Sequence, residues 1–178
     1  MEQMKAKVCL CGDHAVGKTS LIARFVHNVF GDKYIRTIGT KITSKEVIID
    51  DPNGKGQINF IYQIWDIMGQ RDYRNYMKDS YFYGCKGCIM VFDLTRPETL
   101  HDLDNWYGVI NDVAGNVPAI VMANKVDLKD MREVDDNTLE RFCGERGFSY
   151  HLTSAKSGDN VEDSFEEIGL LMLGVCRP

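Results

Sequence analysis

Short runs of apolar and β-branched residues alternate along the chain with longer segments in which apolar residues recur every three to four positions. The short runs predict strands, and the longer segments predict amphipathic helices. The predicted strands are 7–11, 42–49, 58–65, 88–93, 118–123 and 148–152. The predicted helices are 18–29, 98–110, 135–145 and 161–173. Because strands and helices alternate, we expect an α/β fold with a mostly parallel sheet and helices on both faces.

One pair of strands departs from this alternation. The turn-forming stretch Asp-Pro-Asn-Gly-Lys-Gly at 51–56 joins strands 42–49 and 58–65 without room for a helix, so the pair is expected to form an antiparallel hairpin. The predicted sheet therefore has six strands, mostly parallel with one antiparallel hairpin strand, flanked by about five helices. No internal repeat or linker interrupts residues 1–178, which predicts a single domain.

Composition narrows the class of protein. The chain has 178 residues, of which 44% are hydrophobic and 26% charged, as in a soluble globular domain. Its net charge of −5 argues against nonspecific binding of nucleic acid, which needs a basic face. No apolar run is long enough to span a bilayer, and the N-terminal residues lack the pattern of a signal peptide. These features predict a cytoplasmic location.

The six cysteines are interpreted as free thiols in a reducing compartment. Cys9 and Cys11 lie two apart on a predicted strand, so they should share one face and act as small core residues. Cys85 and Cys88 have the C-x-x-C spacing of a redox or zinc site. A tetrahedral zinc site needs four ligands, and no second C-x-x-C or matching pair of histidines follows. Core thiols are therefore favoured over a metal site.

A phosphate-binding loop follows the first predicted strand. Residues 12–19 read Gly-Asp-His-Ala-Val-Gly-Lys-Thr and match G-x-x-x-x-G-K-[ST] at a strand-to-helix junction. Inward backbone N–H groups and the helix N-terminus would bind phosphate, Lys18 would reach the β- and γ-phosphates, and the Thr19 hydroxyl would ligate Mg²⁺. The motif predicts a P-loop NTPase without naming the base. The candidate phosphate-binding residues are Gly12, Asp13, His14, Ala15, Val16, Gly17, Lys18, Thr19 and Ser20.

A second motif indicates which base is bound. Residues 124–127 read Asn-Lys-Val-Asp and follow a predicted strand. The carboxylate of Asp127 could accept hydrogen bonds from both N1–H and the exocyclic amine of guanine, and adenine has no such pair of donors. Asn124 would join neighbouring loops, and the aliphatic stem of Lys125 would cover the base. A backbone N–H of the Ser-Ala-Lys stretch could bind the guanine O6, which adds the candidates Ser154, Ala155 and Lys156.

With both motifs in place, the sequence resembles a small GTPase of the Ras superfamily, with the pattern of the Rab branch, from about residue 5 to the final helix. Phe30 resembles the aromatic residue that packs against guanine in that family. The stretch from Tyr34 to Gly39 resembles the first switch, and residues 65–70 resemble the second. The interval between the two guanine motifs is too short for the extra helix typical of the Rho branch.

The resemblance implies a set of roles around the γ-phosphate. Thr37 would supply its hydroxyl to Mg²⁺ and its N–H to the γ-phosphate, and Asp66 would hold Mg²⁺ through a water. The N–H of Gly69 would also contact the γ-phosphate. Gln70 would orient the attacking water, so that Gln70, Lys18 and Thr37 form the implied catalytic set. Hydrolysis in such sites is slow until an activating partner supplies an arginine.

The resemblance also implies a cycle between GTP and GDP with Mg²⁺. Segments 30–41 and 66–83 would relax when the γ-phosphate leaves and would signal to effectors, with an exchange factor and a GTPase-activating protein as regulators. A monomer is implied. Trp65 and Tyr81 match an aromatic set that contacts effectors in the Rab branch, with Ile42 where a third aromatic is usual. Whether these aromatics are interface or core stays open.

Four residues depart from the family pattern. Ile67 and Met68 replace the usual Thr-Ala, which either changes the partner surface or reflects drift. Arg71 replaces the usual Glu and could act as an internal arginine finger or as a solvated surface charge. His14 stands where small residues are usual, and its imidazole could obstruct an incoming arginine or turn to solvent.

The C-terminus departs as well. Cys176 is third from the end, so no prenylation motif is present and no membrane anchor is expected in this chain; either a lipidated tail is missing from it or the protein is unlipidated. Three functions are considered. A GTP-hydrolysing switch is favoured. A GTP-binding interaction module with little or no hydrolysis is the alternative, and an ATPase or kinase is opposed by Asp127.

Overall fold

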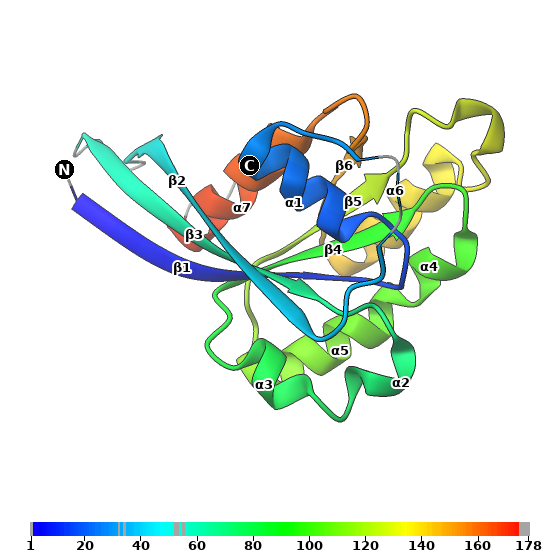
Figure 1. Ribbon diagram of the computed structural model, residues 1–178, viewed down its shortest axis with the longest axis horizontal. Coiled ribbons are helices and arrows are strands. Elements are labelled where there is room, and N and C mark those ends of the chain that lie inside the picture. Colours follow the sequence, from blue (N-terminus) through cyan, green and yellow to red (C-terminus); the bar gives the residue numbers. More distant parts are fainter. Residues whose placement is uncertain (1, 32, 34, 52–53, 55, 175–178) are drawn as a thin grey trace.

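A computed structural model describes residues 2–31, 33, 35–51, 54 and 56–174. It contains one six-stranded sheet with the order β2-β3-β1-β4-β5-β6 (Figure 1). Its strands are β1 (Glu2–Cys11), β2 (Thr40–Asp50), β3 (Gln57–Ile67), β4 (Gly87–Asp93), β5 (Ala119–Asn124) and β6 (Ser149–Thr153). Strand β2 runs antiparallel to β3, and every other neighbouring pair is parallel. The predicted sheet and its hairpin are confirmed.

The helices cover both faces of this sheet (Figure 1). They are α1 (Lys18–His27), α2 (Arg71–Arg74), α3 (Lys78–Phe82), α4 (Pro97–His101), α5 (Leu103–Ala114), α6 (Asp136–Arg146) and α7 (Val161–Met172), with a 3₁₀ turn at Lys129–Met131. The helix predicted over 98–110 is divided into α4 and α5. Asp102 between them keeps right-handed helical angles, with φ −70° and ψ −13°, so the two helices are nearly continuous. Helix α1 ends two residues before the predicted boundary, where Asn28 adopts a left-handed conformation.

Alternation along β1 divides the core into two layers. Val8 and Leu10 pack with α1 and α7 on one face of the sheet, whereas Cys9 and Cys11 pack with α3, α5 and α6 on the other. All four side chains are buried. Since the central strands are covered on both faces, the carboxyl ends of the parallel strands are the part of the sheet left to bind a ligand.

The thiols are core residues, as predicted. Cys9, Cys11, Cys85 and Cys88 are buried and free, and the Sγ atoms of Cys11 and Cys88 lie 3.3 Å apart. Among residues 2–174, leaving aside the undescribed positions, no group of three or more His, Cys, Asp or Glu side chains could hold a metal ion. Cys176 lies outside the described residues. Across the same part of the chain, no helix has the length and apolarity to cross a bilayer.

Candidate nucleotide-binding site

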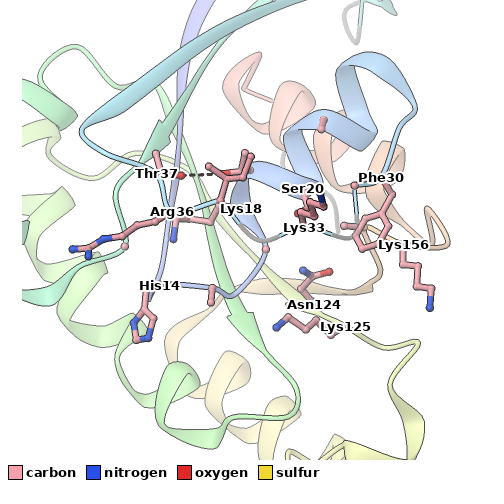
Figure 2. Close-up of a pocket in the computed structure, with 18 of the residues that line it drawn as sticks. His14, Lys18, Ser20, Phe30, Lys33, Arg36, Thr37, Asn124, Lys125 and Lys156 are labelled. Carbon is pink, nitrogen blue, oxygen red and sulfur yellow. Dashed lines mark hydrogen bonds between the residues drawn. The ribbon is translucent and has the colours of Figure 1, made fainter.

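The loops that follow β1, β5 and β6 surround a pocket of about 520 Å³ (Figure 2). The residues predicted for the site that line it are His14, Ala15, Gly17, Lys18, Thr19, Ser20, Phe30, Thr37, Gly69, Gln70, Asn124, Lys125, Asp127, Ala155 and Lys156. In Figure 2, Lys18 and Thr37 stand at one end of the pocket, and Phe30 and Lys156 at the other. The fold therefore brings the phosphate motif and the guanine motif to one cavity of the size that a small ligand needs.

The remaining predicted residues stand behind the wall of the pocket and support it. They are Gly12, Asp13, Val16, Asp66 and Ser154, each joined by a hydrogen bond to a residue that lines the pocket. Tyr34 lies outside the described residues. Six residues that sequence reasoning did not select also line the pocket, namely Ala23, Gly31, Lys33, Ile35, Arg36 and Leu128.

The phosphate loop closes around the ammonium group of Lys18. Gly12 has φ +139°, and a Cβ there would lie 2.0 Å from the carbonyl oxygen of Val91, so only glycine allows the chain to turn against β4. The Lys18 Nζ donates hydrogen bonds to the carbonyl oxygens of Gly12 at 2.8 Å and Asp13 at 2.7 Å. Burial lowers the pKa of Lys18 to about 8. The loop thus encloses a cation at the first turn of α1, an arrangement suited to an anionic ligand.

Three oxygen donors from separate segments meet beside this loop. The Thr19 Oγ1 lies 3.0 Å from the Thr37 Oγ1 and donates a hydrogen bond to the Asp66 Oδ2 at 2.5 Å. The other carboxylate oxygen of Asp66 is buried and has no hydrogen-bond partner within the described segments. Burial raises the pKa of Asp66, although the bond from Thr19 and the charge of Lys18 oppose it. Two hydroxyls and a carboxylate are the hard donors that Mg²⁺ prefers, so these residues fit a magnesium ion.

Direct bonds between loops build the other end of the pocket. Ser154 Oγ donates to the Asp127 Oδ1 at 2.6 Å and accepts the backbone N–H of Ser157 at 3.0 Å. The Asn124 Nδ2 donates to the carbonyl oxygen of Val16 at 2.8 Å, which is the tie between loops expected of Asn124. The guanine motif is therefore joined both to the phosphate loop and to the loop after β6.

Two supporting residues, Asp93 and Arg24, were not predicted from the sequence. Asp93 is fully buried at the end of β4, and its Oδ2 lies 2.6 Å from the Lys125 Nζ. From α1, Arg24 donates to the carbonyl oxygens of Ala155 at 2.9 Å and Lys156 at 2.6 Å. Neither residue belongs to a motif. A signal existed for Asp93, because a single carboxylate ends an otherwise apolar buried strand.

Arg71 and His14, which depart from the family pattern, both contact Asp13. The Arg71 side chain is 50% exposed, and its guanidinium lies against the Asp13 Oδ2, at 3.1 Å from Nε and 2.6 Å from Nη2. Arg71 is therefore a surface charge, as one of the two interpretations held, and it is paired with the phosphate loop. The His14 ring is 59% exposed and turns outward, with Nδ1 2.7 Å from the Asp13 Oδ1. Burial raises the pKa of Asp13, but hydrogen bonds from the His14 N–H and from Arg71 outweigh burial and leave that pKa below its usual value.

Ile67 and Met68 lie in different environments. Ile67 is fully buried in the core layer with α3 and α5, so it does not contribute to a partner surface. Met68 is half-buried, and its N–H donates to the Gly39 carbonyl at 3.2 Å, which joins the two predicted switch segments. The two aromatic residues compared with the effector-binding set differ in exposure. Tyr81 is buried, whereas Trp65 is half-buried, and the Lys7 Nζ lies 3.5 Å from the centre of the Trp65 ring.

Comparison with known proteins gives one consistent result. The family model described as "Ras family" matches residues 7–173. Ras-related protein Rab-7b of Mus musculus is 36% identical over 169 residues, which cover 93% of this chain and 81% of the relative. Ras-related protein YPTC6 of Chlamydomonas reinhardtii is 34% identical over 163 residues, covering 91% and 72%, and Rab-7b of Homo sapiens is 35% identical over 169 residues, covering 93% and 81%. The chain therefore belongs to the Ras family of GTP-binding switch proteins and is similar to its Rab members.

Proposed function

We propose that this chain is a molecular switch that binds GTP or GDP with Mg²⁺ and hydrolyses GTP slowly, and that residues 1–178 act as one small-GTPase domain. The observation that carries the proposal is the single pocket that joins the phosphate loop to Asp127. One sheet links all the described strands, which supports a single domain. Membership of the Ras family supports the general activity.

Asp127 selects the base. Its carboxylate accepts the N1–H and the exocyclic amine of guanine, while Ser154 fixes one of its oxygens from behind. The buried Asp93 holds the ammonium of Lys125, so the aliphatic stem of that lysine is fixed along one face of the base. Phe30 contributes an aromatic ring to the same end of the pocket. Adenine offers no matching pair of donors and would leave the carboxylate unpaired.

The phosphates occupy the opposite end. Lys18, which now bonds the loop carbonyls, would turn to the β- and γ-phosphates, and Thr19, Thr37 and Asp66 would hold the metal. When bound, Mg²⁺ neutralises negative charge on the β- and γ-phosphates. The backbone N–H of Gly69 faces the terminal phosphate from the second switch. These contacts come from three segments, the phosphate loop, segment 30–41 and segment 66–83, and they meet at the phosphate end of the pocket.

Hydrolysis depends on Gln70, which lines the pocket and orients the attacking water. Phosphoryl transfer needs charge neutralisation as well as position. The Arg71 guanidinium is paired with Asp13, and that of Arg36 points away from Lys18 in Figure 2. With neither guanidinium on the phosphate, the intrinsic rate is low and an activating protein supplies the missing arginine.

Loss of the γ-phosphate removes one attachment from each switch. Segment 30–41 is joined to the phosphate loop by the hydroxyl contact between Thr37 and Thr19. It is joined to segment 66–83 by the bond from the Met68 N–H to the Gly39 carbonyl and by the first residues of the β2–β3 pairing. These segments bind effectors, an exchange factor and a GTPase-activating protein. By similarity to Rab proteins, we place the chain in membrane traffic or related signalling, as a cytoplasmic monomer recruited to membranes by its partners.

The test begins with the nucleotide. Purified protein is denatured, the released nucleotide is identified by chromatography, and phosphate release is then followed from protein loaded with GTP. We expect guanine nucleotide, slow turnover, and at least about tenfold slower turnover in Gln70→Leu with unchanged GTP affinity. Gln57→Leu, at an exposed glutamine on the hairpin, is the matched control.

Two results would contradict the proposal. Adenine nucleotide in the released fraction would reject the role of Asp127. GTP that persists for hours in the wild type, with Gln70→Leu indistinguishable from it, would favour the alternative of a GTP-binding module without hydrolysis. The observation that favours this alternative is the exposed His14 ring beside the pocket, where it could obstruct an incoming arginine.

A further inference from the structure

An ion-pair cluster joins the phosphate loop to the start of the second switch. Asp13 is its centre and is only 2% exposed. Its Oδ1 accepts the backbone N–H of His14 at 2.7 Å, and its Oδ2 accepts both Nε and Nη2 of Arg71. A second guanidinium, that of Arg96, donates to the His14 carbonyl at 3.0 Å and lies 3.7 Å from the same Oδ2. The loop carboxylate therefore has bonds to both of its oxygens.

The cluster also fixes the far end of α2. Arg74, the last residue of this helix, forms an ion pair with Asp102, and its guanidinium lies 4.3 Å from the ring centre of Trp106. Both Arg74 and Asp102 are buried. The Arg71 Nε is 3.6 Å from the same carboxylate of Asp102. Because α2 has only four residues, these contacts hold it at its first and last positions.

Gln70 lies between two contacts to Asp13. On one side, the backbone of Gly69 approaches so closely that a Cβ there would lie 2.5 Å from the Asp13 carbonyl carbon. On the other side, the Arg71 side chain reaches the Asp13 carboxylate. None of these contacts uses a phosphate or a metal ion. The residue that orients the attacking water is thus flanked by attachments made by the protein itself.

We propose that Arg71 is a positioning residue that holds Gln70 at the phosphate end of the pocket whether or not a γ-phosphate is present. A charge-assisted hydrogen bond to a buried carboxylate is stronger than a neutral one, so it can replace part of the tether that the γ-phosphate gives to this segment. The start of the second switch then stays ordered with GDP, and the response to GTP is concentrated in segment 30–41. The effect on hydrolysis rests on the proposed function; the effect on order does not.

The test uses Arg71→Ala with Arg146→Ala as the matched control. Arg146 makes a similar two-atom contact with a carboxylate, that of Asp104, at 2.6 and 2.8 Å, on the face formed by α5 and α6. Amide hydrogen exchange of residues 68–76 is measured in the GDP-loaded and GTP-analogue-loaded proteins. GTP affinity and the single-turnover rate at saturating GTP are measured in parallel.

We expect residues 68–76 to be protected in both nucleotide states of the wild type and of Arg146→Ala. In Arg71→Ala, exchange in the GDP state should be at least about tenfold faster, and hydrolysis at least about tenfold slower, because the variant loses both hydrogen bonds from Arg71 to the Asp13 carboxylate. GTP affinity should stay within about twofold, since Arg71 does not line the pocket. Arg71→Lys, which keeps the charge but offers one donor group, should restore part of both effects.

The proposal would be overturned if Arg71→Ala matched Arg146→Ala in both hydrogen exchange and hydrolysis. It would also be overturned if Arg71→Ala hydrolysed GTP faster than the wild type. Arg71→Gln, which keeps most of the side-chain length, decides the question if Arg71→Ala does not fold. If the wild type fails to hydrolyse GTP, the hydrolytic part of the proposed function is wrong, and hydrogen exchange in the GDP state still decides the role of Arg71.

Discussion

The two ends of the pocket are built on different principles. At the base end, polar side chains are paired with partners in the protein, as Lys125 is with the fully buried Asp93 and Asp127 with Ser154. At the phosphate end, the one side-chain hydrogen bond of Thr37 to another described residue is its hydroxyl contact of 3.0 Å with Thr19. Pre-formed pairs lower the cost of ordering a binding site, whereas a site held by few contacts must be ordered by its ligand. The base end thus favours affinity and the phosphate end favours a change of state.

The surroundings of Thr37 explain why the phosphate end can change conformation easily. Its neighbours Ile35 and Ile38 are 80% and 87% exposed, so residues 35–38 include no buried apolar side chain. Segments with few buried contacts open at low cost in free energy. A ligand that attracts the Thr37 hydroxyl and N–H can therefore order this segment, and its loss can release it.

The largest effect is expected at the base end. Asp127→Ala removes the acceptor of two hydrogen bonds, and two bonds to a charged group correspond to a loss of about 10³-fold in guanine nucleotide affinity. Displacement of a fluorescent GDP analogue measures it. Asp130→Ala, at an exposed aspartate three residues along, is the control and should bind normally. Equal affinities in the two variants would show that base selection does not depend on Asp127.

The fold and the pocket wall were largely predictable from sequence because they depend on local patterns. Apolar periodicity identified every strand of the sheet, and the two nucleotide motifs fall where parallel strands end. Two short helices, α2 and α3, were not predicted. Helix α2 is only four residues long and is stabilised by contacts with Asp13 and Asp102, which lie 58 and 28 positions from their partners. Periodicity over four residues carries no such information.

A smaller effect is expected from a residue that no motif identifies. Asp93→Asn keeps the size of the side chain but removes the charge that holds Lys125, so the stem over the base loses its anchor. Dissociation of GDP should become about tenfold faster, as loss of one charged pair to a buried partner predicts. Stopped-flow release of a labelled nucleotide measures the rate. Asp112→Asn, in an exposed pair with Lys78, is the control and should leave the rate unchanged.

Asp93 also carries a structural role that must be separated from its effect on the nucleotide. Its Oδ1 accepts the N–H of Thr95 at 2.9 Å and the Thr95 hydroxyl at 2.7 Å, and an amide oxygen can still accept both. The midpoint temperature of thermal unfolding should therefore be no more than a few degrees lower in Asp93→Asn than in the wild type. If dissociation is unchanged while the protein unfolds at a lower temperature, the base end is not held in place by this pair, and the contrast with the phosphate end weakens.

The surroundings of Arg71 and Ile67 could not be predicted from the sequence. The sequence could only compare these residues with those usual in the family and left two interpretations open for each. In the fold, the carboxylate of Asp13 draws Arg71 to the phosphate loop, and the core layer around Phe82 encloses Ile67. The burial of Ile67 and the ion pair of Arg71 both depend on residues distant in sequence, which the sequence alone does not identify.

The smallest effect concerns the protonation of Lys18. Its amino group is in place at the phosphate end before the ligand binds, but only part of the population is protonated. Burial lowers its pKa to about 8, and phosphates would raise it again by favouring the ammonium form. Binding of GDP to nucleotide-free protein should therefore take up about 0.2 proton at pH 7.5 and about 0.8 proton at pH 8.5, where the phosphates themselves are already deprotonated. Titration calorimetry in buffers of different ionisation enthalpy measures this uptake. A heat independent of buffer at pH 8.5 would mean that Lys18 is already fully charged, and the phosphate end would then be as well prepared for its ligand as the base end.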